Sequence, residues 1–220
     1  MNRTELARLI DHSVLKPEST AQDIREGAQV VRTWRVGYYC VQPCWVPLAA
    51  EALAGDPALV IAVVGFPHGC DRADVKARAT EAAIADGARE IDTVMNFGAL
   101  RSGDTALAAA DIAAVVRAAQ RIPVKVILET GALNDAEKRL ACRLAVDAGA
   151  AFVKTSTGFH ASGGATAGDV RLMREAVGPD IGVKASGGIR VLVDALAMIE
   201  SGANRIGASA TAAILSALLK

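Results

Sequence analysis

Three segments of the chain share one local pattern, in which a helix-forming stretch ends, Gly-Ala or a close variant follows, and a short apolar run begins. The segments read AIADGAREID, LAVDAGAAFVK and MIESGANRIG. Glycine just past a helical stretch is a common C-terminal stop signal. A joint that recurs in this way indicates repeated βα units, which build a parallel sheet covered by helices.

Eight short apolar runs rich in strand formers recur along the chain, separated by longer Ala-rich amphipathic stretches. The runs cover residues 8–15, 37–42, 59–66, 90–97, 124–130, 151–156, 181–188 and 205–209. Helices are expected between them, at 71–86, 104–120, 134–147, 169–177 and 191–201, with Asp71, Asn134 and Thr166 as N-caps. A further short helix is expected before Asp11, covering the bottom of the sheet.

The number of units decides between two architectures. Runs that are apolar on both faces suit a parallel sheet buried on both sides. Eight βα units in 220 residues predict an α/β fold of the (β/α)₈ TIM-barrel type, with residues 1–220 forming a single domain. A doubly wound open sheet is the alternative, and the lack of a GxGxxG motif after the first run disfavours it.

Composition narrows the function classes. Hydrophobic residues make up 52% of the chain, charged residues 22%, and the net charge is zero. A neutral balance argues against binding to nucleic acid or to a membrane surface. No apolar run approaches the roughly 20 residues of a membrane span, and the charged start, MNRTELARLIDHSVLK, lacks the pattern of a signal peptide. We expect a cytoplasmic protein. The four cysteines and three histidines show no zinc-type spacing.

Two apolar runs end on lysine, Lys154 in AFVKTSTGFH and Lys184 in IGVKASGGIR. Strand side chains alternate with a period of two, so Asp92, Lys154 and Lys184 can all point into one cavity at the C-terminal end of the barrel. Burial and a second ammonium lower the pKa of a lysine, which makes its amine a nucleophile for carbonyl groups. With Asp92 as a proton acceptor, the three residues predict a Schiff-base aldolase.

The alternative interpretation is that both lysines form structural ion pairs with Asp92, Asp11 or Glu129. Lys125 lies early in its run, so an ion pair with a neighbouring carboxylate explains it at least as well as a role in the site. His12 has two open interpretations, a catalytic group or a hydrogen-bonded histidine at the barrel mouth. A non-catalytic barrel that binds a sugar phosphate is the other class of function.

Small residues follow three neighbouring strands, as STG at 156–158, SGG at 186–188 and GAS at 207–209. Backbone N–H groups in such loops, next to helix N-termini, form cradles for anions. Phosphate sites in this fold commonly follow strands 7 and 8. The loops therefore predict a phosphorylated substrate.

The chain resembles the deoxyribose-phosphate aldolase family in seven motifs, in order and spacing. They are IDHSVLKP, VVGFPHG, EIDTVMNFG, KVILETG, FVKTSTGF, VKASGGIR and RIGAS. The resemblance implies a TIM barrel that reversibly cleaves 2-deoxy-D-ribose 5-phosphate to acetaldehyde and D-glyceraldehyde 3-phosphate. It implies no metal or organic cofactor, a role in deoxyribonucleotide catabolism, and a homodimer or homotetramer. A related lysine aldolase acting on another phosphorylated sugar is the nearest alternative.

The resemblance also assigns residues. It implies Lys154 as the Schiff-base nucleophile, Lys184 as the group that perturbs its pKa, and Asp92 as the proton donor and acceptor. Phosphate contacts are implied for Gly158, Gly187, Gly188 and Ser209. We further expect Asp11 and Thr157 to hold a water and the substrate hydroxyls, and Cys40 to lie near the mouth. The family usually has two small polar residues after strand 8, whereas here Ser209 is followed by Ala210.

Overall fold

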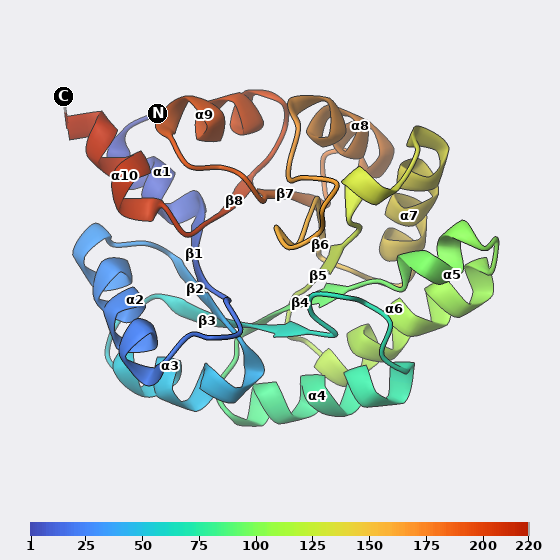
Figure 1. The fold of residues 1–220 in the computed structure, drawn as a ribbon, viewed down its shortest axis with the longest axis horizontal. Coiled ribbons are helices and arrows are strands. Elements are labelled where there is room, and N and C mark those ends of the chain that lie inside the picture. Colours follow the sequence, from blue (N-terminus) through green and yellow to red (C-terminus); the bar gives the residue numbers. More distant parts are fainter. Residues whose placement is uncertain (220) are drawn as a thin grey trace.

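The computed structural model describes residues 1–219 and shows a closed parallel barrel (Figure 1). Within these residues eight strands pair in chain order, and β8 closes the barrel against β1. The strands are β1 Ile10–Val14, β2 Tyr38–Val41, β3 Leu59–Val64, β4 Glu90–Val94, β5 Val124–Ile127, β6 Phe152–Lys154, β7 Gly182–Ser186 and β8 Arg205–Ala208. The predicted TIM barrel is confirmed, and the doubly wound open sheet is excluded.

Helices form an outer ring around the strands (Figure 1). They are α1 Arg3–Leu9, α2 Ala21–Trp34, α3 Val46–Ala52, α4 Ala73–Ala85, α5 Phe97–Arg101, α6 Thr105–Ala119, α7 Asp135–Asp147, α8 Ala167–Val177, α9 Leu192–Glu200 and α10 Thr211–Ser216. One main core cluster packs between the helices and the strands. No helix among the residues described is long and apolar enough to cross a membrane.

The predicted N-terminal helix is present as α1. Asn2 caps it through a capping box with Glu5, which satisfies two backbone donors that the first turn leaves free. Leu6 and Ala7 bury the inner face of the helix. The chain then passes directly into β1, so α1 lies at the N-terminal end of the first strand.

The helix ends follow the sequence signals with one exception. Asn134 forms a capping box at the start of α7, and the Thr166 hydroxyl caps α8. The prediction for Asp71 is wrong: α4 starts two residues later, after Arg72, whose side chain makes no capping hydrogen bond within residues 1–219. Arg72 instead pairs with the exposed Asp74. Positive φ angles confirm the helix stops at Gly87, Gly149 and Gly202.

Strand register places the charged side chains of the barrel interior next to one another. Asp92 of β4 lies opposite Lys125 of β5, and Lys154 of β6 lies opposite Lys184 of β7. Lys184 in turn lies opposite Arg205 of β8. Since side chains at paired positions share a face, these residues all project into the barrel.

The cap at α7 gives a stability prediction. Asn134→Ala removes the capping box, so we expect the free energy of unfolding to fall by about 1 kcal/mol in urea denaturation. Arg72→Ala at the start of α4 is the matched control, because it removes only an exposed ion pair, and its change should stay within about 0.5 kcal/mol. Equal losses in the two variants would mean that the capping box adds no stability to α7.

Candidate active site

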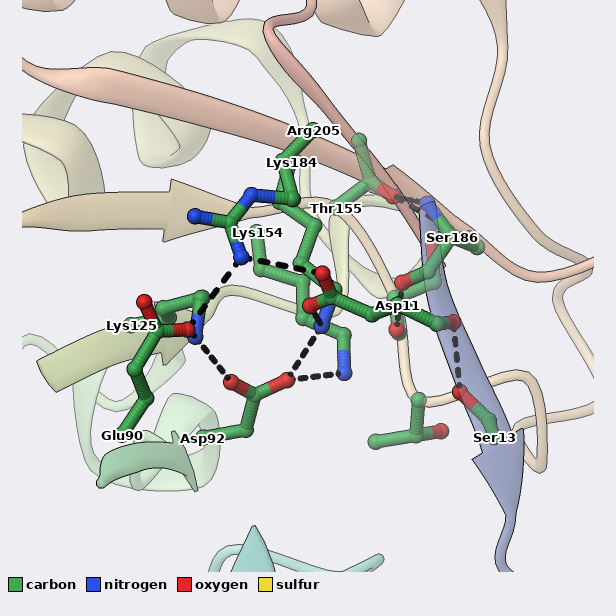
Figure 2. Close-up of polar contacts among 12 residues, drawn as sticks. Asp11, Ser13, Glu90, Asp92, Lys125, Lys154, Thr155, Lys184, Ser186 and Arg205 are labelled. Carbon is green, nitrogen blue, oxygen red and sulfur yellow. Dashed lines mark hydrogen bonds and ion pairs between the residues drawn. The ribbon is translucent and has the colours of Figure 1, made fainter. Parts of the chain in front are cut away.

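Lys154 ends β6 at the floor of a cavity of about 710 Å³ at the C-terminal end of the barrel. Its Nζ donates a hydrogen bond to Asp92 Oδ2 at 2.8 Å (Figure 2). Only 3% of the Lys154 side chain is exposed, while Asp92 is fully buried behind it. The amine is therefore at the boundary between the cavity and the charged interior.

Lys184 lies deeper than Lys154 and does not line the cavity. Its Nζ donates to Asp92 Oδ2 at 2.7 Å and also to Asp11 Oδ2 (Figure 2). Both lysines thus share one carboxylate oxygen. The ion pairs considered as the alternative interpretation are formed, but of the two amines it is Lys154 that reaches the cavity.

The surroundings separate the proton affinities of the two amines. Burial lowers the pKa of Lys154; Asp92 opposes this and the Lys184 ammonium adds to it, so the pKa falls below its ordinary value. Burial acts on the pKa of Lys184 in the same direction, yet Asp11 and Asp92 flank that amine and raise its pKa overall. Lys184 stays protonated, and Lys154 is the amine that loses its proton more readily.

Asp92 is a carboxylate held ionised by its neighbours. Burial alone raises its pKa, but the charges of Lys125, Lys154 and Lys184 outweigh burial and hold the pKa well below the usual range. Lys125 Nζ lies 3.1 Å from Asp92 Oδ1, as an ion pair without hydrogen-bond alignment. Lys125 is itself fully buried and also pairs with Glu90, so the ion-pair interpretation of this residue describes its geometry.

Asp11 lies in the barrel interior rather than on the cavity wall. It is fully buried and pairs with Lys184 and, at 3.0 Å, with Arg205. Burial raises its pKa, but the nearby cations bring it below the ordinary value. Both carboxylate oxygens are engaged by cations, so the structure places Asp11 behind Lys184 and away from a substrate in the cavity.

Five of the predicted binding residues lie together on the cavity wall. They are Thr157, Gly158, Gly187, Gly188 and Ser209. The loops pack backbone against backbone: a Cβ at Gly187 would lie 2.9 Å from Gly164 Cα and 3.3 Å from Gly158 Cα. Gly187 also has a φ of +89°, which disfavours other residues. Ala210 precedes α10 and provides no side-chain cap there, within the residues described.

Thr157 has a partner that the sequence did not reveal. Its hydroxyl donates to Glu129 Oε2 at 2.6 Å, and its N–H lies 3.3 Å from both Glu129 oxygens. Glu129 is 1% exposed and adopts a left-handed backbone conformation, with φ of 58°. The Thr157 hydroxyl therefore fixes the loop after β6 to the end of β5.

Cys40 lies deeper than predicted. Its side chain is fully buried with Leu15, Ile61 and Val63, and it does not line the cavity. Burial, followed by the charge of Asp92, raises the pKa of the thiol to about 12. The predicted position at the mouth is wrong, because the β2 register turns Cys40 inward, and the thiol stays protonated at neutral pH.

His12 lines the cavity as a hydrogen-bonded histidine. Its Nδ1 lies 2.9 Å from Thr211 Oγ1, and its ring stacks on Tyr39 with centroids 5.9 Å apart. Burial lowers its pKa from an ordinary 6.5 to about 4. The ring is therefore neutral at physiological pH.

Sequence reasoning missed Glu90 and Arg205. Arg205 Nη1 donates to Asp11 Oδ1 at 3.0 Å and to Glu90 Oε2 at 3.2 Å (Figure 2). Both residues begin their strands: Glu90 lies two positions before Asp92, and Arg205 lies opposite Lys184. The period of two that places Asp92 inward also places Glu90 inward, and that signal was present in the sequence.

The barrel brings a lysine of lowered pKa to a cavity at the C-terminal end of its strands, and comparison with known proteins identifies the chain as an aldolase. The profile of the DeoC/LacD family aldolases matches residues 6–217. The chain therefore belongs to the DeoC/LacD aldolase family. Its curated relatives are deoxyribose-phosphate aldolases, and the chain is an enzyme of that type, a lyase.

Individual relatives cover nearly the whole chain. Deoxyribose-phosphate aldolase 1 of Bacillus licheniformis is 54% identical over 97% of this chain and 96% of its own. A putative deoxyribose-phosphate aldolase from Coccidioides immitis superimposes with a TM-score of 0.96 at 35% identity, covering 100% of this chain and 88% of its own. A structure described as a unique tetrameric deoxyribose phosphate aldolase from Aeropyrum pernix gives a TM-score of 0.91 at 28% identity, covering 99% and 92%.

The buried His12 gives a pH prediction. Because its folded pKa, about 4, lies below the roughly 6.5 of an unfolded chain, the unfolded state binds the proton first as the pH falls. Stability should decline between about pH 6.5 and 4 for this reason. NMR titration of the His12 ring should give the low pKa directly, and His12→Gln should flatten this part of the stability profile. A ring that titrates near 6.5 would contradict the prediction.

Proposed function

We propose that the enzyme reversibly cleaves 2-deoxy-D-ribose 5-phosphate to acetaldehyde and D-glyceraldehyde 3-phosphate through a Schiff base on Lys154. One observation carries this proposal: an amine of lowered pKa faces the cavity while a second, protonated lysine shares its carboxylate partner. An unprotonated amine is the form that attacks a carbonyl carbon. Lys154, Lys184 and Asp92 are the proposed catalytic residues.

The first half of the mechanism forms the imine. The neutral amine of Lys154 attacks C1 of the open-chain aldehyde and gives a carbinolamine. Lys184 then supplies a proton by way of Asp92 Oδ2, which contacts both amines at 2.7–2.8 Å, and water leaves. The positive charge moves from Lys184 to the iminium nitrogen on Lys154. The total charge of the buried cluster is unchanged, so the step places no new charge in a low-dielectric site.

The second half breaks the carbon–carbon bond. The iminium accepts the electron pair as C2–C3 cleaves, and the proton of the C3 hydroxyl passes through water to the site that Asp92 and the neutral Lys184 form. Glyceraldehyde 3-phosphate leaves, and an enamine remains on Lys154. The Lys184–Asp92 pair gives that proton to C2 and restores the iminium. Water then hydrolyses the iminium to acetaldehyde and the free amine, and the proton released in this step returns to Lys184. Lys184 thus alternates between acid and base through the cycle, with Asp92 as the link, and ends protonated as it began.

The loops after β6, β7 and β8 are proposed to hold the 5-phosphate. Gly158, Gly187, Gly188 and Ser209 all line the cavity, and α9 begins four residues after Gly188. Backbone amides and a helix N-terminus attract anions. Ala210 offers no hydroxyl, so these contacts come from Ser209 and the backbone.

The wider setting is also a proposal. We propose a role in deoxyribonucleotide catabolism in the cytoplasm, and a homodimer or homotetramer as the assembly. The tetramer described for the Aeropyrum pernix relative supports the higher assembly state. Light scattering of the purified protein tests it.

The covalent intermediate is the first thing to measure. Acetaldehyde and borohydride should leave a reduced two-carbon adduct on the peptide that carries Lys154, and Lys154→Met should abolish it. Lys16→Met is the matched control, since Lys16 lines the same cavity but has no part in the imine. The adduct on Lys154 should persist in this variant. An adduct that forms with dihydroxyacetone phosphate and not with acetaldehyde would mean that the enzyme is an aldolase with a different donor. Intact folded protein without any adduct would refute the Schiff-base mechanism.

Removing the second amine tests its role. Lys184→Met takes away the ammonium that disfavours protonation of Lys154 and leaves Asp92 free to pair with Lys154. The pKa of Lys154 should rise, so the acid limb of the kcat/KM profile should move to higher pH. Turnover at pH 7 should fall by about 10²–10⁴ with the loss of the proton donor. An unchanged pH profile would rule out the proposed coupling.

A further inference from the structure

Six buried charged side chains beneath the cavity form a closed circuit in which cations and carboxylates alternate. We call this set the charge ring; in order around it stand Lys184, Asp92, Lys125, Glu90, Arg205 and Asp11. The contacts are 2.7 Å for Lys184–Asp92, 3.1 Å for Asp92–Lys125, 3.2 Å for Glu90–Arg205 and 3.0 Å for Arg205–Asp11, and the Lys125–Glu90 and Lys184–Asp11 pairs complete it. Figure 2 shows the ring as linked side chains.

The charge ring is neutral by itself, since it holds three cations and three carboxylates. Lys154 attaches from outside, through Asp92 Oδ2. The titratable groups that face its amine are Asp92 from β4, Lys184 from β7 and the Cys40 thiol from β2. Within residues 1–219, Lys154 is thus the fourth cation of a cluster with three carboxylates. When Lys154 loses its proton, each of the three carboxylates still has a cation to balance it.

Glu90 and Arg205 close the ring, and neither residue lines the cavity. Arg205 Nη1 bridges a carboxylate of β1 and one of β4. The guanidinium lies 3.4 Å from the centroid of the Tyr38 ring and 5.1 Å from that of Phe152. Aromatic faces on this cation fix its place, since they attract it without adding a countercharge.

We propose that Glu90 and Arg205 are positioning residues for Lys154: by closing the charge ring, they keep its three carboxylates compensated by cations other than Lys154. The inference rests on the proposed function of Lys154 as the nucleophile. It goes further, because it makes the protonation state of Lys154 depend on the balance of charges in the whole ring as well as on the nearest neighbours of the amine.

The proposal predicts opposite effects for the two residues. Arg205→Met leaves three carboxylates and two ring cations, so Lys154 becomes the third cation and holds its proton more tightly. Glu90→Gln leaves two carboxylates and three ring cations, so Lys154 gives up its proton more easily. The double variant again has equal numbers of each charge. If the two residues had only structural roles, their substitutions would not shift the pKa of Lys154 in opposite directions.

The experiment is an NMR titration of the Lys154 side chain in protein labelled at lysine Cε, with the resonance assigned from Lys154→Met. Arg205→Met should raise the pKa of Lys154 by about one unit and Glu90→Gln should lower it by a similar amount. The double variant should return to within about 0.3 units of the parent protein. Shifts in the same direction, or none, would overturn the proposal.

Two further variants keep the test decisive. Arg205→Lys retains a ring cation, so the pKa of Lys154 in this variant should equal that in the parent protein. If Arg205→Met does not fold, an unchanged pKa in Arg205→Lys together with a lowered pKa in Glu90→Gln is the expected result, and any other result overturns the proposal. Arg139→Met removes an arginine from an exposed pair with Glu175 and should leave the titration unchanged. Borohydride trapping on the same samples separates the two proposals: opposite shifts without any adduct would refute the Schiff base alone, whereas an adduct without opposite shifts would refute the ring alone.

Discussion

The shared oxygen of Asp92 is the contact on which the proposed chemistry of this barrel depends. Oδ2 accepts hydrogen bonds from Lys154 and Lys184, while Oδ1 faces Lys125. A carboxylate surrounded in this way stays ionised, and it contacts both amines at nearly the same distance. The two amines differ in proton affinity because of their other neighbours: Lys184 also pairs with Asp11, whereas Lys154 faces the cavity.

Such an interior is costly to build. Each buried ion loses its hydration, and pairing in the protein offsets that loss only with good geometry. Parallel strands in a closed barrel provide this geometry, because paired positions on neighbouring strands bring charged side chains to the same level, as at Asp92 and Lys125. Most of the apolar stabilisation comes from the cluster between strands and helices, while the barrel interior holds the charged side chains beside a small apolar cluster around Cys40.

Local pattern was enough to predict the barrel and the three central residues. Strand-end lysines and the period of two predicted that Lys154, Lys184 and Asp92 point inward, since these signals need no knowledge of strand order, although only Lys154 lines the cavity. Depth was not predictable in the same way: Asp11 and Cys40 lie in the interior because barrel closure sets β1 and β2 against their neighbours. The Thr157–Glu129 contact and the contacts of Arg205 likewise join residues far apart in sequence.

The close packing of Gly158, Gly164 and Gly187 limits how substrate scope can change. Any side chain at Gly187 would push two loops apart, so natural variation or engineering on this wall would disturb the mouth as a whole. The wall formed by the segment after β1, with Lys16, Glu18 and Ser19 along the cavity, carries side chains that come from a single loop. The shape of the cavity is therefore more readily changed by redesign on the β1 side, where a substitution alters shape and charge without breaking backbone packing.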